Sequence, residues 1–239
     1  MTVPLDGIDL IIFDKDGTII DFGRMWAGWA ETLAASLGTA AGRAVEEPLY
    51  AMLGYDPVAR AVRVGGGLAA TPMARLRERT VGVLVDTGLG DEDAERAVAA
   101  AWHAPDPVAL AHPIGAVGAL FRELRAGGRR LAIATSDDRE PTERSLAALD
   151  LLDALDGLVC ADDGLPVKPA PEAVFHLCAS MGVGTDQTAV VGDSPVDLRM
   201  ARAASVGLAV GVLTGVGGRA DLEPLADVVI ESVEGLLPD

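Results

Sequence analysis

The segment DLIIFDKDGT, residues 9–18, joins an apolar run to a pair of carboxylates. The run DLIIFD is almost continuously apolar, which is typical of a strand buried on both faces of a parallel sheet. Asp14 and Asp16 stand at its carboxyl end. Parallel α/β sheets bind their ligands at that end of the strands, where the loops converge. We therefore expect residues 9–14 to form the first strand of an α/β sheet and to carry both carboxylates to its ligand-binding edge.

Similar apolar runs recur along the chain, and helical patterns alternate with them. The further predicted strands cover residues 130–135, 158–161, 188–192, 206–212 and 226–230, and the predicted helices cover 114–126, 139–149, 172–181, 196–204 and a region near 233–237. Such alternation is typical of a doubly wound sheet with helices on both faces. The sequence therefore predicts a doubly wound, parallel α/β fold.

The segment 22–112 interrupts this alternation. Helical patterning, clearest at 26–37 and 91–102, runs through it without a convincing strand, and glycine and proline residues mark its two limits. We predict that residues 1–21 and 113–239 form the α/β core. Residues 22–112 are expected to form an all-helical domain inserted after the first strand.

Composition and charge exclude several classes of partner. Half of the 239 residues are hydrophobic, enough for a sizeable core, and the net charge is −17. A surface this acidic repels phosphate backbones and anionic lipids, so we expect neither a nucleic acid nor a membrane partner. The longest uncharged run, residues 203–218, is shorter than the ~20 apolar residues that a membrane span needs. The sequence does not indicate an oligomeric state.

The amino-terminal segment and the two cysteines indicate a cytoplasmic protein. No basic residue precedes Lys15 and the first apolar run is short, so we expect no signal peptide. Cys160 and Cys178 have neither the spacing of a redox pair nor the number needed for a disulfide framework. We expect both to be buried, reduced thiols.

Asp14 and Asp16 admit two interpretations on their own. Two carboxylates so close together repel each other, and a divalent cation would relieve that repulsion. The same DxDG pattern also occurs in solvated acidic turns, where an aspartate caps a helix. A calcium loop needs a further acidic position, which this run lacks.

Three other predicted strand ends carry polar groups, each of which is ambiguous alone. Thr135 and Ser136 offer hydroxyls and backbone N–H groups to a phosphate, or a cap to the next helix. Lys168, in a Lys-Pro step before a predicted helix, offers a positive charge or forms a surface turn. Asp193 and Asp197 offer carboxylates to a cation, or serve as helix-terminal acids.

Together, these four strand ends give the chain a resemblance to the haloacid dehalogenase (HAD) superfamily, and to its phosphatases in particular. An apolar run with DxDGT, an apolar run with Thr, Lys-Pro and GDSxxD occur in this order over nearly the whole chain. The resemblance implies a Rossmann-like core, with 22–112 as the helical cap that closes over the site. The segment GVLTGVGG, residues 211–218, resembles that of phosphoglycolate-phosphatase-type members.

The resemblance also implies a role for each polar residue. Asp14 would be the nucleophile that forms an aspartyl-phosphate, and Asp16 the acid that protonates the leaving oxygen and later activates water. Thr135, Ser136 and Lys168 would bind the phosphate. Asp193 would hold Mg²⁺ together with Asp14 and the carbonyl of Asp16, and Asp197 would support these ligands. Phosphoryl transfer depends mostly on positioning and charge neutralisation, which these groups would supply.

Lys15 departs from the family pattern, because the position between the two acids is often apolar. In an extended segment its side chain would point away from those of Asp14 and Asp16. We expect it to reach solvent or the cap interface, without an assigned catalytic role.

The resulting function is Mg²⁺-dependent hydrolysis of a small phosphorylated metabolite, with phosphoglycolate or a sugar phosphate as plausible substrates. Asp16 argues against a dehalogenase, which lacks this acid. A sugar-phosphate mutase is the alternative enzyme, although such mutases tend to carry Glu where this chain has Gly192. A non-catalytic phosphate-binding module is the alternative of another class. Substrate specificity would lie in the cap, where Arg24, Trp26, Trp29 and the arginines of 60–79 are candidates.

Overall fold

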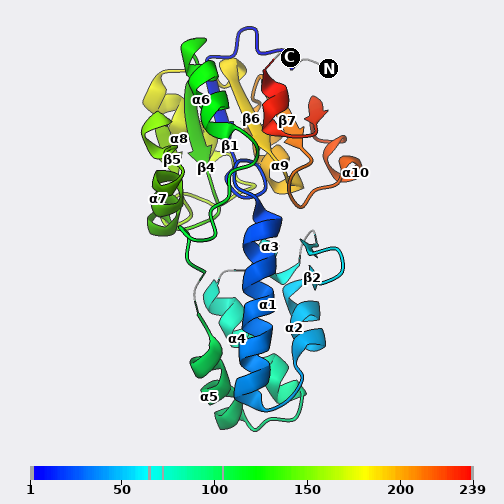
Figure 1. Cartoon of the computed structure of the whole chain (residues 1–239). Helices are drawn as coiled ribbons and strands as arrows, with labels where there is room; N and C mark the ends of the chain where they lie inside the picture. Colours follow the sequence, from blue (N-terminus) through cyan, green and yellow to red (C-terminus); the bar gives the residue numbers. More distant parts are fainter. Residues whose placement is uncertain (1–2, 64–65, 72, 104, 238–239) are drawn as a thin grey trace. The chain divides into compact units, whose positions relative to one another are not determined.

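Six parallel strands form the central sheet of the computed structural model, which describes residues 3–63, 66–71, 73–103 and 105–237 (Figure 1). Their order across the sheet is β5-β4-β1-β6-β7-β8. The strands are β1 (Leu10–Phe13), β4 (Arg130–Ala134), β5 (Gly157–Val159), β6 (Thr188–Gly192), β7 (Leu208–Val212) and β8 (Val228–Ile230). This confirms the predicted parallel α/β core.

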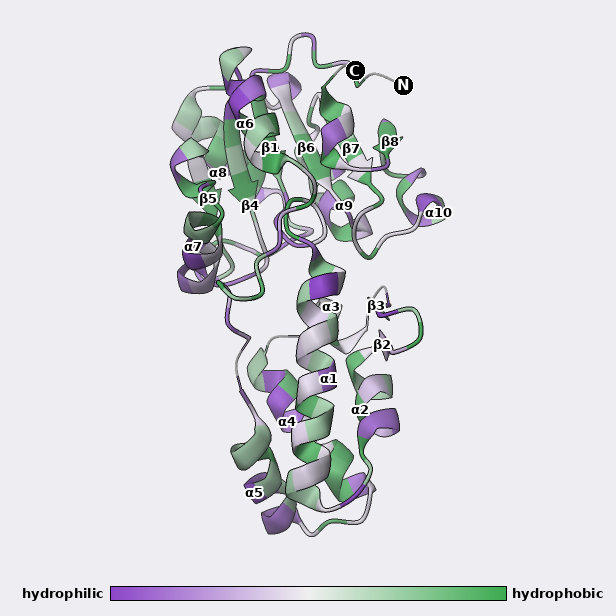
Figure 2. Ribbon diagram, viewed as in Figure 1, coloured by the Kyte–Doolittle hydropathy of each residue, from purple (hydrophilic) through white to green (hydrophobic). Residues whose placement is uncertain are grey.

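Both faces of the sheet are buried. Alternate side chains of each strand point to opposite faces, and each face packs into its own apolar cluster. Ile11 and Phe13 lie in one apolar cluster, and Phe13 packs on Phe121 with ring centroids 5.1 Å apart. Leu10 and Ile12 lie in a second cluster on the other face. The strands are accordingly hydrophobic along most of their length (Figure 2).

Helices supply the apolar residues that cover these two faces. The first cluster includes residues of α6 (Val117–Ala126) and of the 3₁₀ turn η3 (Val233–Leu236), and the second includes residues of α8 (Glu172–Met181) and α9 (Pro195–Ala204). The remaining elements of the core are α7 (Arg139–Ala148), α10 (Arg219–Leu222) and the 3₁₀ turns η1 (Leu152–Ala154) and η2 (Thr185–Gln187).

The order of the strands determines where a ligand can bind. From β1 the sheet extends to β4 and β5 on one side and to β6, β7 and β8 on the other. The strand order therefore reverses at β1, and in open α/β sheets such a reversal leaves a crevice at the carboxyl ends of the strands. Asp14 follows β1 directly and lies at this point.

Contacts within the chain define two compact units, Met1–Phe22 with Pro107–Asp239, and Gly23–Asp106. The second unit contains α1 (Phe22–Ala41, which begins one residue earlier), α2 (Glu46–Leu53), α3 (Gly67–Ala70), α4 (Met73–Asp86) and α5 (Asp91–Ala101). Its Trp29 is buried and donates a 3.0 Å hydrogen bond from Nε1 to the carbonyl of His103. Trp29 is therefore a core residue of this unit.

The second unit is not purely helical, whereas the sequence pattern predicted helices alone. β2 (Tyr55–Asp56) and β3 (Ala61–Val62) form an antiparallel pair. Asp56 closes the turn between them, because its Oδ1 accepts hydrogen bonds from the N–H groups of Val58 and Ala59, at 2.9 and 3.0 Å. Strands of two residues are too short to produce a visible alternation of apolar and polar residues, so the pattern could not predict them.

Two further expectations concern the thiols and the membrane. Cys160 and Cys178 are both buried and free, as predicted. Among the described residues, no helix has the length and apolar character required to cross a bilayer.

Candidate active site

The turn after β1 holds the first two carboxylates of the site. The N–H of Asp14 still donates to the carbonyl of Val191 in β6, at 2.8 Å, so the nucleophile candidate is fixed by the sheet. The chain then turns sharply: the carbonyl of Lys15 accepts hydrogen bonds from the N–H groups of Ile19 and Ile20. Gly17 has φ +84°, a conformation that other residues rarely adopt. The DKDGT segment is therefore a tight, closed turn.

Lys168 connects two carboxylates of the site. Its Nζ lies 2.6 Å from Oδ1 of Asp14 and 2.7 Å from Oδ1 of Asp197, and its side chain is 5% exposed. Asp197 also accepts hydrogen bonds from the hydroxyl and the N–H of Ser194, which caps α9. Asp197 thus aligns Lys168 from the first turn of α9.

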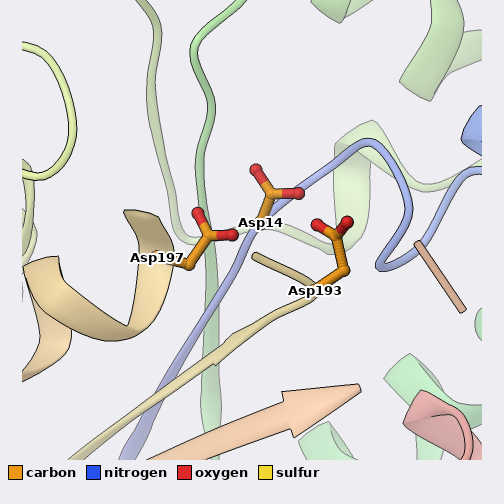
Figure 3. A group of neighbouring side chains, drawn as sticks. All are labelled: Asp14, Asp193 and Asp197. Carbon is orange, nitrogen blue, oxygen red and sulfur yellow. The ribbon is translucent and has the colours of Figure 1, made fainter. Parts of the chain in front are cut away.

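Asp193 completes a cluster of three acids. Asp14, Asp193 and Asp197 each offer one carboxylate oxygen, and these oxygens lie within 4.8 Å of one another. Figure 3 shows the three carboxyl groups turned toward a common space, from the ends of β1 and β6 and from α9.

The loop after β7 holds Asp193 in place. The N–H of Val216 donates to Oδ2 of Asp193 at 2.7 Å, and the N–H of Gly217 donates to its carbonyl at 2.9 Å. A Cβ on Gly215 would overlap the carboxyl group of Asp193, and a Cβ on Gly17 would lie 2.6 Å from its Oδ2. Two glycines therefore pack directly on this carboxylate.

Burial and repulsion between neighbouring carboxylates raise the pKa values of Asp14 and Asp193. Burial raises the pKa of Asp14 to about 6, with Lys168 lowering it and Asp197 raising it. Burial, together with the charges of Asp14 and Asp197, holds the pKa of Asp193 well above its usual range. Burial would lower the pKa of Lys168, but its two carboxylate partners outweigh this effect and raise it.

This arrangement fits a hard divalent cation. Carboxylate oxygens are the ligands that Mg²⁺ prefers, and a cation would relieve the repulsion that raises the pKa values. Oδ1 of Asp193 accepts no hydrogen bond from any described residue, whereas both oxygens of Asp197 are engaged by Lys168 and Ser194. Within the described part of the chain, Oδ2 of Asp14 accepts only a long hydrogen bond, at 3.4 Å from the hydroxyl of Thr18. Asp14 and Asp193 are therefore better placed to ligate a cation than Asp197, whose carboxylate supports Lys168.

Thr135 and Ser136 follow β4, the strand next to β1. Thr135 is buried; its N–H donates to the carbonyl of Val159, and its Oγ1 accepts from the N–H of Asp137 at 3.1 Å. Ser136 is exposed. The two hydroxyls thus differ in accessibility, and their predicted role in phosphate binding stays a prediction.

Lys15 does not reach solvent, and this expectation from the sequence was wrong. It is 3% exposed, and its Nζ lies 2.8 and 2.7 Å from the two carboxylate oxygens of Asp16 and 3.0 Å from Oδ2 of Asp137. The reason is the tight turn, since an alternating orientation holds only while the backbone stays extended.

Burial and the charge of Lys15 together shift the pKa values of Asp16 and Asp137. Burial raises the pKa of Asp16 to about 7, against the opposing effect of Lys15, and Asp137 raises it further. Burial would raise the pKa of Asp137, but the charge and hydrogen bond of Lys15, together with the hydrogen bond of Asp16 and the charge of Lys168, outweigh it and lower this pKa. Asp16 is thus engaged by Lys15 and is not one of the three clustered acids.

Sequence reasoning missed two parts of the site: Asp137, and the backbone of residues 214–217. Thr214 donates from its hydroxyl to the carbonyl of Gly17 at 2.6 Å, which ties this loop to the DKDGT turn. The glycine-rich segment 211–218 was the only sequence signal for the loop.

Three of the five arginines of 60–79 have acidic partners within their own unit. Arg60, Arg75 and Arg77 form ion pairs with Glu31, Glu78 and Glu95 respectively, on exposed side chains. These contacts favour the solvated surface over a substrate-binding face.

Known proteins resemble this chain in sequence. Residues 8–205 match the model of a family described as haloacid dehalogenase-like hydrolase. The phosphoglycolate phosphatase of Rhodospirillum rubrum is 33% identical over 204 residues, covering 82% of this chain and 76% of that protein. A plasmid-encoded phosphoglycolate phosphatase of Cupriavidus necator is 28% identical over 240 residues, covering 95% of this chain and 90% of that protein.

Solved structures show the same fold. A HAD-superfamily hydrolase of subfamily IA from Geobacter sulfurreducens superposes with a TM-score of 0.66 at 19% identity, covering 97% of each chain. A β-phosphoglucomutase from Clostridium difficile superposes with a TM-score of 0.57 at 17% identity, covering 96% of this chain and 93% of that one. At these identities the likeness concerns the fold alone.

Proposed function

The chain belongs to the haloacid dehalogenase-like hydrolase family and is a phosphatase, and on this premise we propose that Asp14 is its nucleophile. The observation that carries the proposal is the position of Asp14 at the carboxyl end of the central strand, with its Oδ1 2.6 Å from Nζ of Lys168. A carboxylate is a competent nucleophile toward phosphorus. Lys168 orients it and supplies a positive charge close to the point of attack.

The first step transfers the phosphoryl group to the protein. A carboxylate oxygen of Asp14 bonds to phosphorus while the bond from phosphorus to the alcohol oxygen breaks. Asp16 gives its proton to that departing oxygen. The raised pKa of Asp16, about 7, supports this role, because such a carboxyl group still holds a proton near neutral pH. Thr135, Ser136 and Lys168 bind the phosphoryl oxygens.

The second step restores the nucleophile. Asp16, now a carboxylate, takes a proton from a water molecule whose oxygen attacks phosphorus. The bond between phosphorus and the Asp14 oxygen breaks, and inorganic phosphate leaves. Asp16 is thereby protonated again, and Asp14 is again a carboxylate. Each proton and bond of the first step is accounted for by the second.

Asp14 and Asp193 would hold a magnesium ion, with Asp197 supporting them through Lys168. The ion supplies charge neutralisation for the anionic phosphoryl group. The clustering of three buried carboxylates supports this assignment.

The substrate we propose is a small phosphate monoester, with phosphoglycolate as the first candidate. The relatives from Rhodospirillum rubrum and Cupriavidus necator carry that activity in their names. A panel of phosphorylated metabolites, assayed for release of inorganic phosphate with Mg²⁺, ranks the candidates by kcat/KM. A preference for a sugar phosphate over phosphoglycolate would replace the proposed substrate and leave the chemistry unchanged.

The nucleophile is tested by Asp14→Asn. We expect this variant to lose turnover, because an amide oxygen is a far weaker nucleophile than a carboxylate. Acid-quenched wild-type protein should carry a labile phosphoryl group, Asp16→Asn should accumulate it, and Asp14→Asn should carry none. Normal turnover of a folded Asp14→Asn protein would place the nucleophile elsewhere.

A mutase is disfavoured by the space around Gly192. A Cβ at this position would overlap the side chain of Asp197. The Glu that mutases tend to carry there would displace the carboxylate that aligns Lys168. The hydrolytic reaction therefore fits this site better.

A further inference from the structure

Lys15 is a buried cation that the proposed chemistry does not use. Its Nζ contacts both oxygens of Asp16 and one oxygen of Asp137, and its side chain is 4% exposed. Lys168 contacts Asp14 and Asp197 instead. The chain has only two lysines among 19 basic residues. Both lysine side chains are buried. Lys168 contacts the proposed nucleophile, Asp14, and Lys15 contacts the proposed general acid, Asp16.

Both ends of the Lys15 contact are anchored to the backbone of the sheet edge. The carbonyl of Lys15 accepts two hydrogen bonds that close the DKDGT turn. Asp137 is held by its own N–H, which donates to Oγ1 of Thr135, and by its carbonyl, which accepts from the N–H of Ala161 at 2.9 Å. Lys15 thus bridges the turn after β1 and the loop after β4.

This bridge restricts the rotation of the Asp16 side chain. An aspartate carboxyl group turns about two bonds, and hydrogen bonds to an ammonium are among the stronger ones available to hold it. Each carboxylate oxygen has two lone pairs, so Asp16 retains a hydrogen-bonding site beside its contacts with Nζ of Lys15 and with Asp137. Asp16 can therefore be held by Lys15 and still exchange a proton with a substrate.

We propose that Lys15, held from its far side by Asp137, is a positioning residue that fixes the carboxyl group of Asp16 relative to the phosphate-binding loop after β4. Lys15 keeps its own protons; the proton that moves is that of Asp16. This inference rests on the proposed function, because it presupposes that Asp16 is the acid that protonates the leaving oxygen.

The test compares two substrates that differ in their need for that acid. An alkyl phosphate, the best monoester of the substrate panel, releases an alkoxide unless its oxygen is protonated. p-Nitrophenyl phosphate releases a stable anion and needs little protonation. The ratio kcat/KM is the right measure, because it reports the steps up to departure of the alcohol and excludes hydrolysis of the phosphoenzyme.

Lys15→Met should act selectively on the alkyl phosphate. We expect its kcat/KM to fall about 10–100-fold, the cost of a displacement of roughly 1 Å in a reacting group. The kcat/KM for p-nitrophenyl phosphate should fall less than about threefold, since general acid catalysis contributes little there. The matched control is Lys168→Met, which removes the partner of Asp14 and should lower both values by similar factors. A merely structural defect at Lys15 would also lower both alike.

A double-mutant cycle separates action through Asp16 from any other effect. In the Asp16→Asn background, Lys15→Met should change kcat/KM for the alkyl phosphate by less than about threefold, because the two residues act as one unit. The proposal would be overturned if the losses of Lys15→Met and Asp16→Asn multiplied in the double variant. It would also be overturned if Lys15→Met lowered kcat/KM equally for the alkyl phosphate and for p-nitrophenyl phosphate.

A second variant covers the case in which Lys15→Met does not fold. Lys15→Gln keeps a hydrogen-bond donor beside Asp16 and should show the same selectivity at smaller amplitude. A folded Lys15→Gln protein that matches wild type on both substrates, or loses both equally, would overturn the proposal. Failure of the proposed function looks different: Asp16→Asn alone would then hydrolyse the alkyl phosphate at the wild-type rate.

Discussion

At the scale of the residue, Lys168 illustrates how one ammonium group organises two carboxylates. It lies at hydrogen-bond distance from Asp14 and from Asp197 while its side chain is almost entirely buried. An ammonium is a compact charge with three donors, and it fits between two oxygens that approach it from different sides. A guanidinium is planar and wider, and it favours a forked contact with one carboxylate.

We therefore expect Lys168→Arg to be nearly as damaging as Lys168→Ala, although it keeps the charge. The larger group would displace Asp14, and a displacement of about 1 Å can cost ~10²-fold in rate. The measurement is kcat/KM of the three proteins on the best substrate of the panel. Retention by Lys168→Arg of more than about a third of the wild-type value, a loss under ~0.7 kcal/mol, would mean that charge alone suffices.

Gly215 tests how closely the loop after β7 supports Asp193. A Cβ at this position would overlap the Asp193 carboxyl group, so Gly215→Ala must move that ligand. We expect the Mg²⁺ concentration for half-maximal activity to rise about tenfold, as for other changes beside metal ligands. Gly82→Ala in α4 is the matched control, because nothing lies within 4 Å of its Cβ, and it should leave that concentration unchanged. If Gly215→Ala has the same half-maximal Mg²⁺ concentration as wild type, the loop after β7 does not hold Asp193 in its metal-binding position.

The residues at the site differ in how well the sequence predicted their surroundings. Asp14, Lys168 and Asp193 each follow or precede a regular element, so the topology alone brings them to one edge of the sheet. Lys15 and Asp137 lie in turns whose path depends on several backbone hydrogen bonds. No periodicity encodes such a path, and the contact between these two residues could not be predicted.

At the scale of the element, strands buried on both faces were the easiest to predict. β1 is apolar throughout, and β4 and β6 are apolar after their first residues, Arg130 and Thr188, as expected for strands that helices cover on both faces. The edge strand β8 begins at Val228, two residues later than the predicted start at 226, and the predicted last helix is the 3₁₀ turn η3. β7 is fully buried, yet it also begins two residues later than predicted, at Leu208, so an apolar pattern fixes the start of a strand only approximately.

The turn after β5 is an element held mainly by charge. Arg139, at the start of α7, donates from Nε and Nη2 to the two oxygens of Asp163, at 2.9 and 2.7 Å. Oδ2 of Asp163 also accepts the N–H of Cys160 at 2.8 Å. The hydrogen bonds from Arg139 are the main reason that the pKa of Asp163 is lowered.

The lowered pKa makes the contribution of Asp163 to stability dependent on pH. A carboxyl group with a lower pKa in the folded than in the unfolded state stabilises the fold above its unfolded pKa, about 3.9. That stabilisation is lost as the pH falls through the folded pKa. Asp163→Asn should therefore lower the free energy of unfolding at pH 7 by about 0.5–1 kcal/mol, the value for a partly exposed ion pair.

Denaturant unfolding at several pH values checks this prediction. The difference between wild type and Asp163→Asn should be constant at neutral pH and should shrink as the pH falls below 4. Asp162→Asn is the matched control, because an amide oxygen can still accept the N–H of Arg139, and it should show little difference at any pH. A difference for Asp163→Asn that persists unchanged at low pH would show that charge is not its cause.

At the scale of the whole molecule, a net charge of −17 surrounds a site that must attract an anionic substrate. Negative charge on Asp14 and Asp193 in this buried cluster works against folding, as the raised pKa values of these two acids indicate. A bound divalent cation would reverse this effect locally. Metal binding should therefore appear in the stability of the protein as well as in its activity.

We expect Mg²⁺ to raise the Tm of the wild-type protein. A ligand that binds only the folded state stabilises it by about 2.7 kcal/mol at a hundredfold excess over its Kd. NaCl at equal ionic strength is the necessary comparison, because salt also screens the repulsion among the surface charges. EDTA should abolish both the added stability and the phosphatase activity.

Asp193→Asn separates binding at the acidic cluster from binding elsewhere on the acidic surface. The amide oxygen can still accept the N–H of Val216, and the change removes one of three mutually repelling charges. Without metal the variant should be at least as stable as wild type near neutral pH, because burial and repulsion penalise the charged form of Asp193. Added Mg²⁺ should then raise its Tm no further than NaCl does. An equal Mg²⁺-induced rise in both proteins would locate the cation away from Asp193 and contradict the proposed metal site.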